Sequence, residues 1–205
     1  MTASTAISPR LPSTALAAAA LWLGLVVVAG AAGFFSRLPF PGAQLIILGL
    51  TVGAVAAGFA VPALRAWIDA LPLRALIGVN ALRFVGIYFL LLASRGELST
   101  LFANRAGWGD IAVATLAIAL VAAGAPDTAG RRALVYAWNA FGLLDLVVAV
   151  GTATMVTVQG VTPGVQPVLS FPLVVVPAFF VPLFLANHIF IFRRLIAAGR
   201  AAGGR

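Results

Sequence analysis

The chain consists mostly of long apolar stretches that are separated by short polar or charged segments. A helix that crosses about 30 Å of hydrocarbon needs roughly 20 mostly apolar residues. Six stretches meet this requirement, and they cover residues 15–35, 43–64, 74–94, 110–126, 133–156 and 171–192. The pattern therefore predicts an all-α integral membrane protein, in which one membrane domain forms a bundle of six transmembrane helices.

The composition supports a chain that uses the lipid bilayer as part of its solvent. Of 205 residues, 62% are hydrophobic and 9% are charged, and the mean hydropathy is +1.11. Soluble domains are closer to half apolar and one quarter charged. A soluble chain of this length could not bury so much apolar surface in a single core. The bilayer is therefore the first expected partner.

All of the basic side chains are arginines, and their distribution predicts an orientation. With the N-terminus inside, the cytoplasmic set is Arg10, Arg65, Arg74, Arg131, Arg132, Arg193, Arg194, Arg200 and Arg205. The outer set is Arg37, Arg95 and Arg105. Because basic loops stay in the cytoplasm, we expect both termini there and a multi-pass protein in the inner (plasma) membrane, with residues 195–205 as a short basic tail. The same distribution accounts for most of the net charge of +8, so no nucleic-acid partner is expected.

The first apolar stretch has an alternative interpretation as a signal peptide. Arg10 precedes the apolar run, and Ala29-Gly30-Ala31 resembles a cleavage site with small residues. The run of residues 15–35 is longer than the apolar part of a typical signal peptide, which favours an anchored helix. Cleavage would leave five spans and an external N-terminus.

Two charged residues lie within predicted spans, Arg83 in the third and Asp145 in the fifth. Charges in hydrocarbon cost roughly 2.5–3.5 kcal/mol on insertion scales, so they turn inward and find partners. Counted from the arginines at the cytoplasmic ends, Arg83 lies about 13 Å deep and Asp145 about 19 Å deep, at 1.5 Å per residue. A stretched arginine covers that difference, so we expect a buried Arg83–Asp145 ion pair.

Other polar residues surround these two charges. Asn80 precedes Arg83 by three residues and shares its helix face. Trp138 and Gly142 share the face of Asp145, whereas Asn139 lies about a third of a turn away. We expect Asn80, Trp138 and Asn139 to belong to the polar centre, which either lines a pathway or fixes helix register.

His188 is the single histidine, and we place it beside Asn187 near the cytoplasmic end of the last span. A lone histidine there is typical of a hydrogen-bonded bundle residue, and a proton relay is the functional alternative. A single histidine excludes sites built from several histidines, and the lack of cysteine excludes thiolate sites. No metal and no cofactor are expected.

The predicted outer connection, residues 94–109, ends at Gly107-Trp108-Gly109. Asp110 follows directly, which is where an aspartate caps the start of a helix. With Glu97 and Arg105, it would form a polar cluster at the outer mouth. A short interfacial helix is expected near residues 98–102.

Two further features concern packing. Gly49, Gly53 and Ala57 form a small-residue stripe that allows another helix to approach closely. Pro177 and Pro182 remove hydrogen bonds inside the last span and should kink it. The packing stripe leaves a homo-oligomer or a membrane partner subunit possible.

Several short motifs resemble those of a group of small, uncharacterised bacterial multi-pass membrane proteins. They are Arg83-x-x-Gly86, Ala106-Gly107-Trp108-Gly109-Asp110-Ile111 and Trp138-Asn139-x-x-Gly142-Leu143-Leu144-Asp145-Leu146. The resemblance covers roughly residues 74–194. It implies a class of membrane protein, and it implies no catalytic residues.

Three functions are compatible with this sequence. A small transporter, channel or solute-binding bundle would use the centre around Arg83 and Asp145. A structural or regulatory membrane subunit would use the same pair to specify assembly. An enzyme acting on a lipid-linked substrate would need Glu97 and Asp110 to converge in a cleft. The buried charges favour the first function.

Overall fold

The computed structural model describes residues 12–203, and these are all helical apart from turns and connections. The first part of the chain forms α1 (Ser13–Ala31), α2 (Phe34–Arg37), α3 (Gly42–Ala60), α4 (Pro62–Ala70) and α5 (Leu73–Gly78). A 3-10 segment, η1 (Val79–Val85), then leads into α6 (Gly86–Ser94), α7 (Thr100–Ala122) and α8 (Ala129–Val158). The last part comprises a 3-10 turn, η2 (Gln166–Leu169), a π-helical turn, η3 (Val176–Phe180), and α9 (Val181–Gly203).

Six helical segments are long and apolar enough to cross a membrane. They are α1, α3, the continuous segment α5–η1–α6, α7, α8, and η3 with α9. This number agrees with the six stretches expected from the sequence. The protein is therefore all-α, with the composition of a multi-pass membrane protein.

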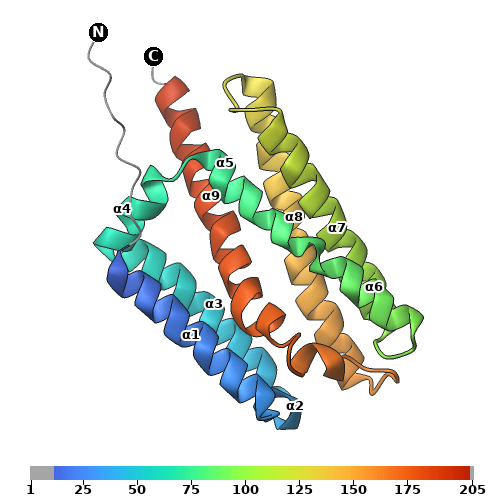
Figure 1. The fold of residues 1–205 in the computed structure, drawn as a ribbon. Coiled ribbons are helices and arrows are strands. Elements are labelled where there is room, and N and C mark those ends of the chain that lie inside the picture. Colours follow the sequence, from blue (N-terminus) through green and yellow to red (C-terminus); the bar gives the residue numbers. More distant parts are fainter. Residues whose placement is uncertain (1–11, 204–205) are drawn as a thin grey trace.

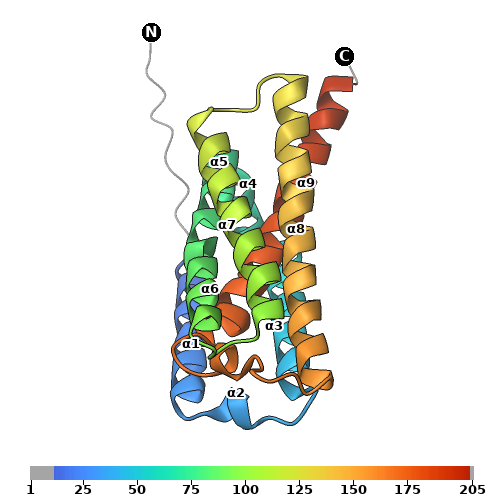
Figure 2. The same cartoon turned by 90° about the vertical axis from the view of Figure 1, so that its right-hand side faces the viewer.

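Helix α9 lies between two groups of helices (Figure 1). On one side α9 packs against α3, and on the other it packs against α8 and α5. Helices α6, α7 and α8 form the second group, in which α7 contacts both of its neighbours extensively. The view after a quarter turn shows α2 and the connection that contains η2 together at one end of the bundle (Figure 2). Helix α1 begins, and α9 ends, toward the opposite end.

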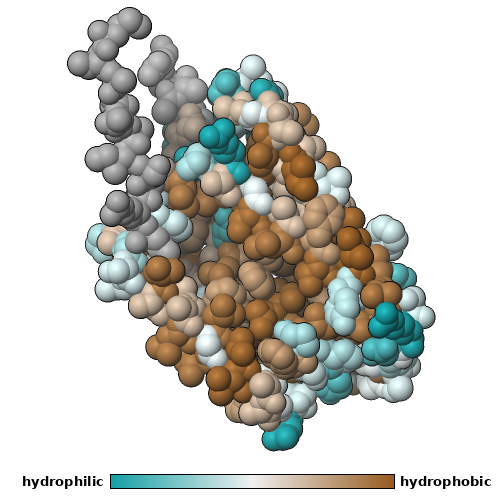
Figure 3. Space-filling model, viewed as in Figure 1, coloured by the Kyte–Doolittle hydropathy of each residue, from teal (hydrophilic) through white to brown (hydrophobic). Residues whose placement is uncertain are grey.

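The outer surface of the bundle is apolar, as a protein in lipid requires. On the face shown in Figure 3, hydrophobic residues form a broad band, and most hydrophilic residues gather toward its ends. Helices α1 and α3 have few buried residues, and large side chains such as Leu25 and Leu48 are exposed on them. Burial of polar groups is instead concentrated where α7, α8 and α9 meet the third span.

The fourth span begins ten residues earlier than the sequence predicts. Helix α7 starts at Thr100, and the hydroxyl of Ser99 accepts a hydrogen bond from the Phe102 amide at 3.5 Å as its N-cap. Asp110 therefore lies inside a helix and is buried, so the prediction that it caps the helix is wrong. The expected interfacial helix at residues 98–102 is the first turn of α7.

The last span is also displaced relative to the prediction. Residues 171–174 form turns, helical structure begins at Val175 and passes into η3, and α9 continues to Gly203. The predicted tail at residues 195–205 is thus helical as far as it is described. Pro177 lies in the π-helical turn and Pro182 in the first turn of α9. Their missing amide hydrogens explain why regular α-helical hydrogen bonding starts only after them.

The small-residue stripe of α3 is not used for packing at its centre. Gly49 and Gly53 are exposed, and a methyl group added at either would meet nothing within 4 Å. The close contact of this helix is instead at Gly58, where an added methyl group would overlap the ring of Phe190 of α9.

The described arginines of the predicted cytoplasmic set lie at the end of the bundle where α1 begins and α9 ends, whereas Arg10 and Arg205 lie outside the described residues. Arg193 anchors α9 to α4 there, because it pairs with Asp69 and its guanidinium lies 5.3 Å from the Phe59 ring and 5.5 Å from the Phe190 ring. Arg105, expected in an outer loop, is in α7.

Candidate functional site

Arg83 lies in η1, in the middle of the third span, with only 1% of its surface exposed. Close contact between α6 and α7 brings the carboxylate of Asp110 next to Arg83. Gly86 and Gly107 face each other, and a methyl group on Gly86 would stand 2.6 Å from the Gly107 carbonyl oxygen. Two glycines at one crossing allow the backbones to approach, as small residues do in membrane bundles. Asp110, one turn after Gly107, therefore reaches Arg83.

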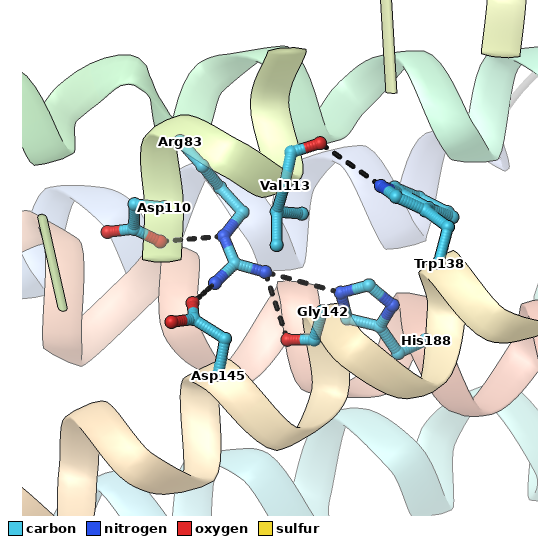
Figure 4. Close-up of polar contacts among 7 residues, drawn as sticks. All are labelled: Arg83, Asp110, Val113, Trp138, Gly142, Asp145 and His188. Carbon is cyan, nitrogen blue, oxygen red and sulfur yellow. Dashed lines mark hydrogen bonds and ion pairs between the residues drawn. The ribbon is translucent and has the colours of Figure 1, made fainter. Parts of the chain in front are cut away.

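The guanidinium of Arg83 has four polar partners on α7, α8 and α9, and the partner on α9 is His188 (Figure 4). Its Nε donates to Asp110 Oδ1 of α7 at 2.7 Å. On α8, its Nη2 pairs with Asp145 Oδ2, and its Nη1 donates to the Gly142 carbonyl oxygen at 3.1 Å. The predicted Arg83–Asp145 ion pair is therefore present in the structure. Sequence reasoning missed Asp110, the second carboxylate on the same arginine.

Glycines also set the approach of α7 and α9 to α8. A methyl group at Gly109 would overlap the Asp145 carboxylate. A methyl group at Gly142 would stand 2.9 Å from His188 Nε2. The motif residues Gly109 and Gly142 thus create the space that the two polar side chains occupy.

His188 is fully buried and lies against Arg83, not near the end of the bundle. Its Nδ1 is 2.8 Å from Asn139 Oδ1, and Asn139 Nδ2 donates to the His188 carbonyl oxygen at 2.9 Å. Because the amide of Asn139 is used by that second bond, its oxygen accepts and Nδ1 of the histidine carries the hydrogen. Nε2 is then a bare acceptor, 3.4 Å from Arg83 Nη1. The network favours a neutral imidazole that faces the guanidinium.

The remaining predicted members of the centre have separate partners. Trp138 Nε1 donates to the Val113 carbonyl oxygen at 3.1 Å, and its ring lies 5.6 Å from the His188 ring. Asn80 Nδ2 donates to the carbonyl oxygens of Leu76 and Ile77, at 3.1 and 3.2 Å. Asn80 is fully buried, and its Oδ1 has no hydrogen-bond partner within the described part of the chain.

The predicted outer-mouth cluster does not form. Glu97 is exposed in the turn after α6, and Arg105 reaches Thr152 of α8 at 3.5 Å. Asp110 belongs instead to the buried centre. The cleft that an enzyme with paired Glu97 and Asp110 carboxylates would need is therefore absent from the described residues. Nor do residues 12–203 contain a group of three histidine or carboxylate side chains that could hold a metal ion.

A cavity of about 80 Å³ lies beside the centre. Arg83 and Asp110 line it at mid-span, and its walls are mostly apolar. Gln44 in the first turn of α3 and Thr157 in the last turn of α8 line it at the end of the bundle where α2 and η2 lie. The cavity thus joins one end of the bundle to the buried charges.

The formal charges of the centre do not balance. One guanidinium faces two carboxylates, and the histidine beside it is neutral in the hydrogen-bond network. With both carboxylates ionised, the centre carries one surplus negative charge. Asp110 is the carboxylate that lines the cavity, so the surplus is accessible from there.

Comparison with known proteins gives a family and no activity. No curated protein and no solved structure matches the chain. A family model described as a domain of unknown function, DUF8737, matches residues 40–196, which include every residue of the centre and most of the chain. The chain therefore belongs to the DUF8737 family.

Proposed function

We propose that the protein is a small membrane transporter or solute-binding bundle of the inner (plasma) membrane, with both termini in the cytoplasm. The observation that carries this proposal is the cavity that reaches Arg83 and Asp110 from the end of the bundle where α2 and η2 lie, which we propose to be the outer end. Intramembrane charges that face a cavity are typical of substrate and ion pathways. A subunit that used the charges only for assembly would need no space beside them.

The two sides of the centre differ in the way that a carrier requires. Toward the outer end, the cavity leads to Gln44 and Thr157. Toward the other end, an apolar cluster that includes Leu76, Trp138 and Ile191 packs beside the centre. A site open to one side and closed to the other corresponds to one state of alternating access. The excess of arginines at the closed end supports placing that end in the cytoplasm.

The absence of cysteine from the natural chain permits a direct test. We would introduce Ala153→Cys, which lines the cavity, and Val147→Cys, which is 57% exposed on the lipid-facing side of the same helix. Ala117→Cys, in the closed apolar cluster, is a second control. Each variant would be treated in sealed vesicles of known orientation with a small, membrane-impermeant methanethiosulfonate reagent.

We expect Ala153→Cys to react at least about tenfold faster than either control, because thiolates form only where water reaches the sulfur. Reaction should occur only when the reagent is on the outer side. Equal, slow reaction of all three cysteines would mean that the cavity is dry, and the structural-subunit function would then replace this proposal. Reaction from the cytoplasmic side would refute the orientation.

A further inference from the structure

The charge and shape of the cavity indicate the kind of solute it accepts, an inference that rests on the proposed function. Asp110 gives Oδ1 to Arg83, and its Oδ2 makes no hydrogen bond within residues 12–203. The carboxylate is 8% exposed and lines the cavity. A charged acceptor therefore stands at the base of an otherwise apolar space.

An anion is a poor ligand for this site, although an arginine lines it. The guanidinium already donates to two carboxylates and to a carbonyl oxygen. With both carboxylates ionised, a third anion would add to a surplus negative charge, in surroundings of low dielectric constant where repulsion is strong. A cation would instead balance the charges.

The side chains that line the cavity also favour a positively charged ligand. The rings of Phe89, Phe102 and Phe184 all line it. Arg83 already lies 5.9 Å from the centre of the Phe184 ring. Aromatic faces attract cations, most strongly where water is excluded. The polar side chains at the outer end, Gln44 and Thr157, are neutral and offer hydrogen-bond acceptors to an entering ammonium group.

We propose that the cavity binds a small organic cation with an apolar body, of the primary alkylammonium class, with its charged group on Asp110. Size sets the body. An apolar cavity of about 150 Å³ holds benzene, so a cavity of about half that volume holds roughly three or four heavy atoms. Longer cations would extend from Asp110 toward Gln44.

The test uses the Ala153→Cys variant and three probes of matched size, n-propylammonium, n-propanol and propionate. Purified full-length protein would react with methyl methanethiosulfonate in the presence of each probe, at about 10–100 mM because ligands of four or five heavy atoms bind weakly. We expect n-propylammonium to slow the reaction of the introduced thiol at least about threefold, with weaker protection by n-propanol and none by propionate. Protection by propionate equal to or greater than that by n-propylammonium would overturn the proposal.

A second variant locates the charged group. Asp110→Asn leaves Arg83 paired with Asp145, and it should abolish the advantage of n-propylammonium over n-propanol. An unchanged advantage in a folded Asp110→Asn protein would place the cation elsewhere and overturn the assignment. If this variant does not fold, the comparison of the three probes with Asp110 intact still decides the sign of the ligand. An Ala153→Cys protein that never reacts refutes the proposed function, whereas one that reacts without protection by n-propylammonium refutes only the cation.

Discussion

Replacement of the two carboxylates on Arg83, singly and together, tests whether the centre is a pair or a set of three charges. After Asp110→Asn, the guanidinium still faces Asp145, and after Asp145→Asn it still faces Asp110. Each single variant exchanges one charged acceptor for a neutral one of the same shape and removes the surplus negative charge. We therefore expect each to cost no more than about 1 kcal/mol, the net value of a typical hydrogen bond.

The double variant leaves a buried guanidinium without a counter-ion. Removing the partner of a buried charge typically costs about 3–5 kcal/mol. The double variant should therefore be at least about 1 kcal/mol less stable than the sum of the singles, a coupling in the range seen for residues of one network.

Thermal unfolding of the purified full-length protein in detergent measures the difference. In soluble proteins of similar length, 1 kcal/mol shifts Tm by about 2–4 °C, so the singles should fall by less than about 4 °C and the double by at least about 6 °C. Asp127→Asn, at an exposed position between α7 and α8, is the matched control and should change nothing. If Asp145→Asn alone were as unstable as the double variant, Arg83 would have one functional counter-ion, and the arrangement of three charges would be refuted.

Three further predictions concern contacts around the centre and in the middle of α9, and each is measured by the same unfolding assay. Gly109→Ala should lower the free energy of unfolding by about 1–3 kcal/mol or more, since the added methyl group overlaps the Asp145 carboxylate. Gly151→Ala is the control, because the space around Gly151 is open. Equal stability of the two variants would contradict the close approach of α7 and α8 at Gly109. Trp138→Phe should cost about 1 kcal/mol through the lost hydrogen bond to a backbone carbonyl, and an unchanged Tm would show that this bond contributes nothing. Arg193→Ala should lower the free energy of unfolding by about 1–2 kcal/mol, because it removes an ion pair and two contacts with aromatic rings. Arg193→Lys should lower it by less. Equal losses for the two variants would exclude a role of the planar guanidinium.

The sequence was sufficient to predict the six spans and the Arg83–Asp145 pair of the centre. Depth along two helices can be counted from flanking arginines at 1.5 Å per residue, and this placed Arg83 and Asp145 within reach of each other. The count succeeded because the helical segment α5–η1–α6 and the helix α8 both run without a break.

Asp110 was missed because Gly107-Trp108-Gly109 has the composition of a turn. In the structure these glycines are sites of close helix approach inside α7, a use that local propensity does not reveal. One signal was present, because the predicted span of residues 110–126 was shorter than the roughly 20 residues that a crossing needs. Extension of that span toward its N-terminus would have buried Asp110.

His188 was misplaced for a different reason. The depth of His188 was counted from Arg194, as though that arginine marked the membrane surface. Helix α9 in fact continues to Gly203, so Arg194 lies inside the helix and does not mark its end. Asn139 lies off the face of Asp145, yet α9 covers that part of α8 as well, and this contact depends on tertiary packing that one helix cannot indicate.

The order of the contacts along the chain has a consequence for how the protein is made. Asp110 follows Arg83 by 27 residues, Gly142 by 59, Asp145 by 62 and His188 by 105. Because a chain is synthesised from its N-terminus, Arg83 is made before any of the groups that contact it. Its first counter-ion arrives with the next span and its last neighbour with the final one. A chain that ends before α7 therefore contains an apolar segment whose arginine has no carboxylate partner, and α7 supplies the first one.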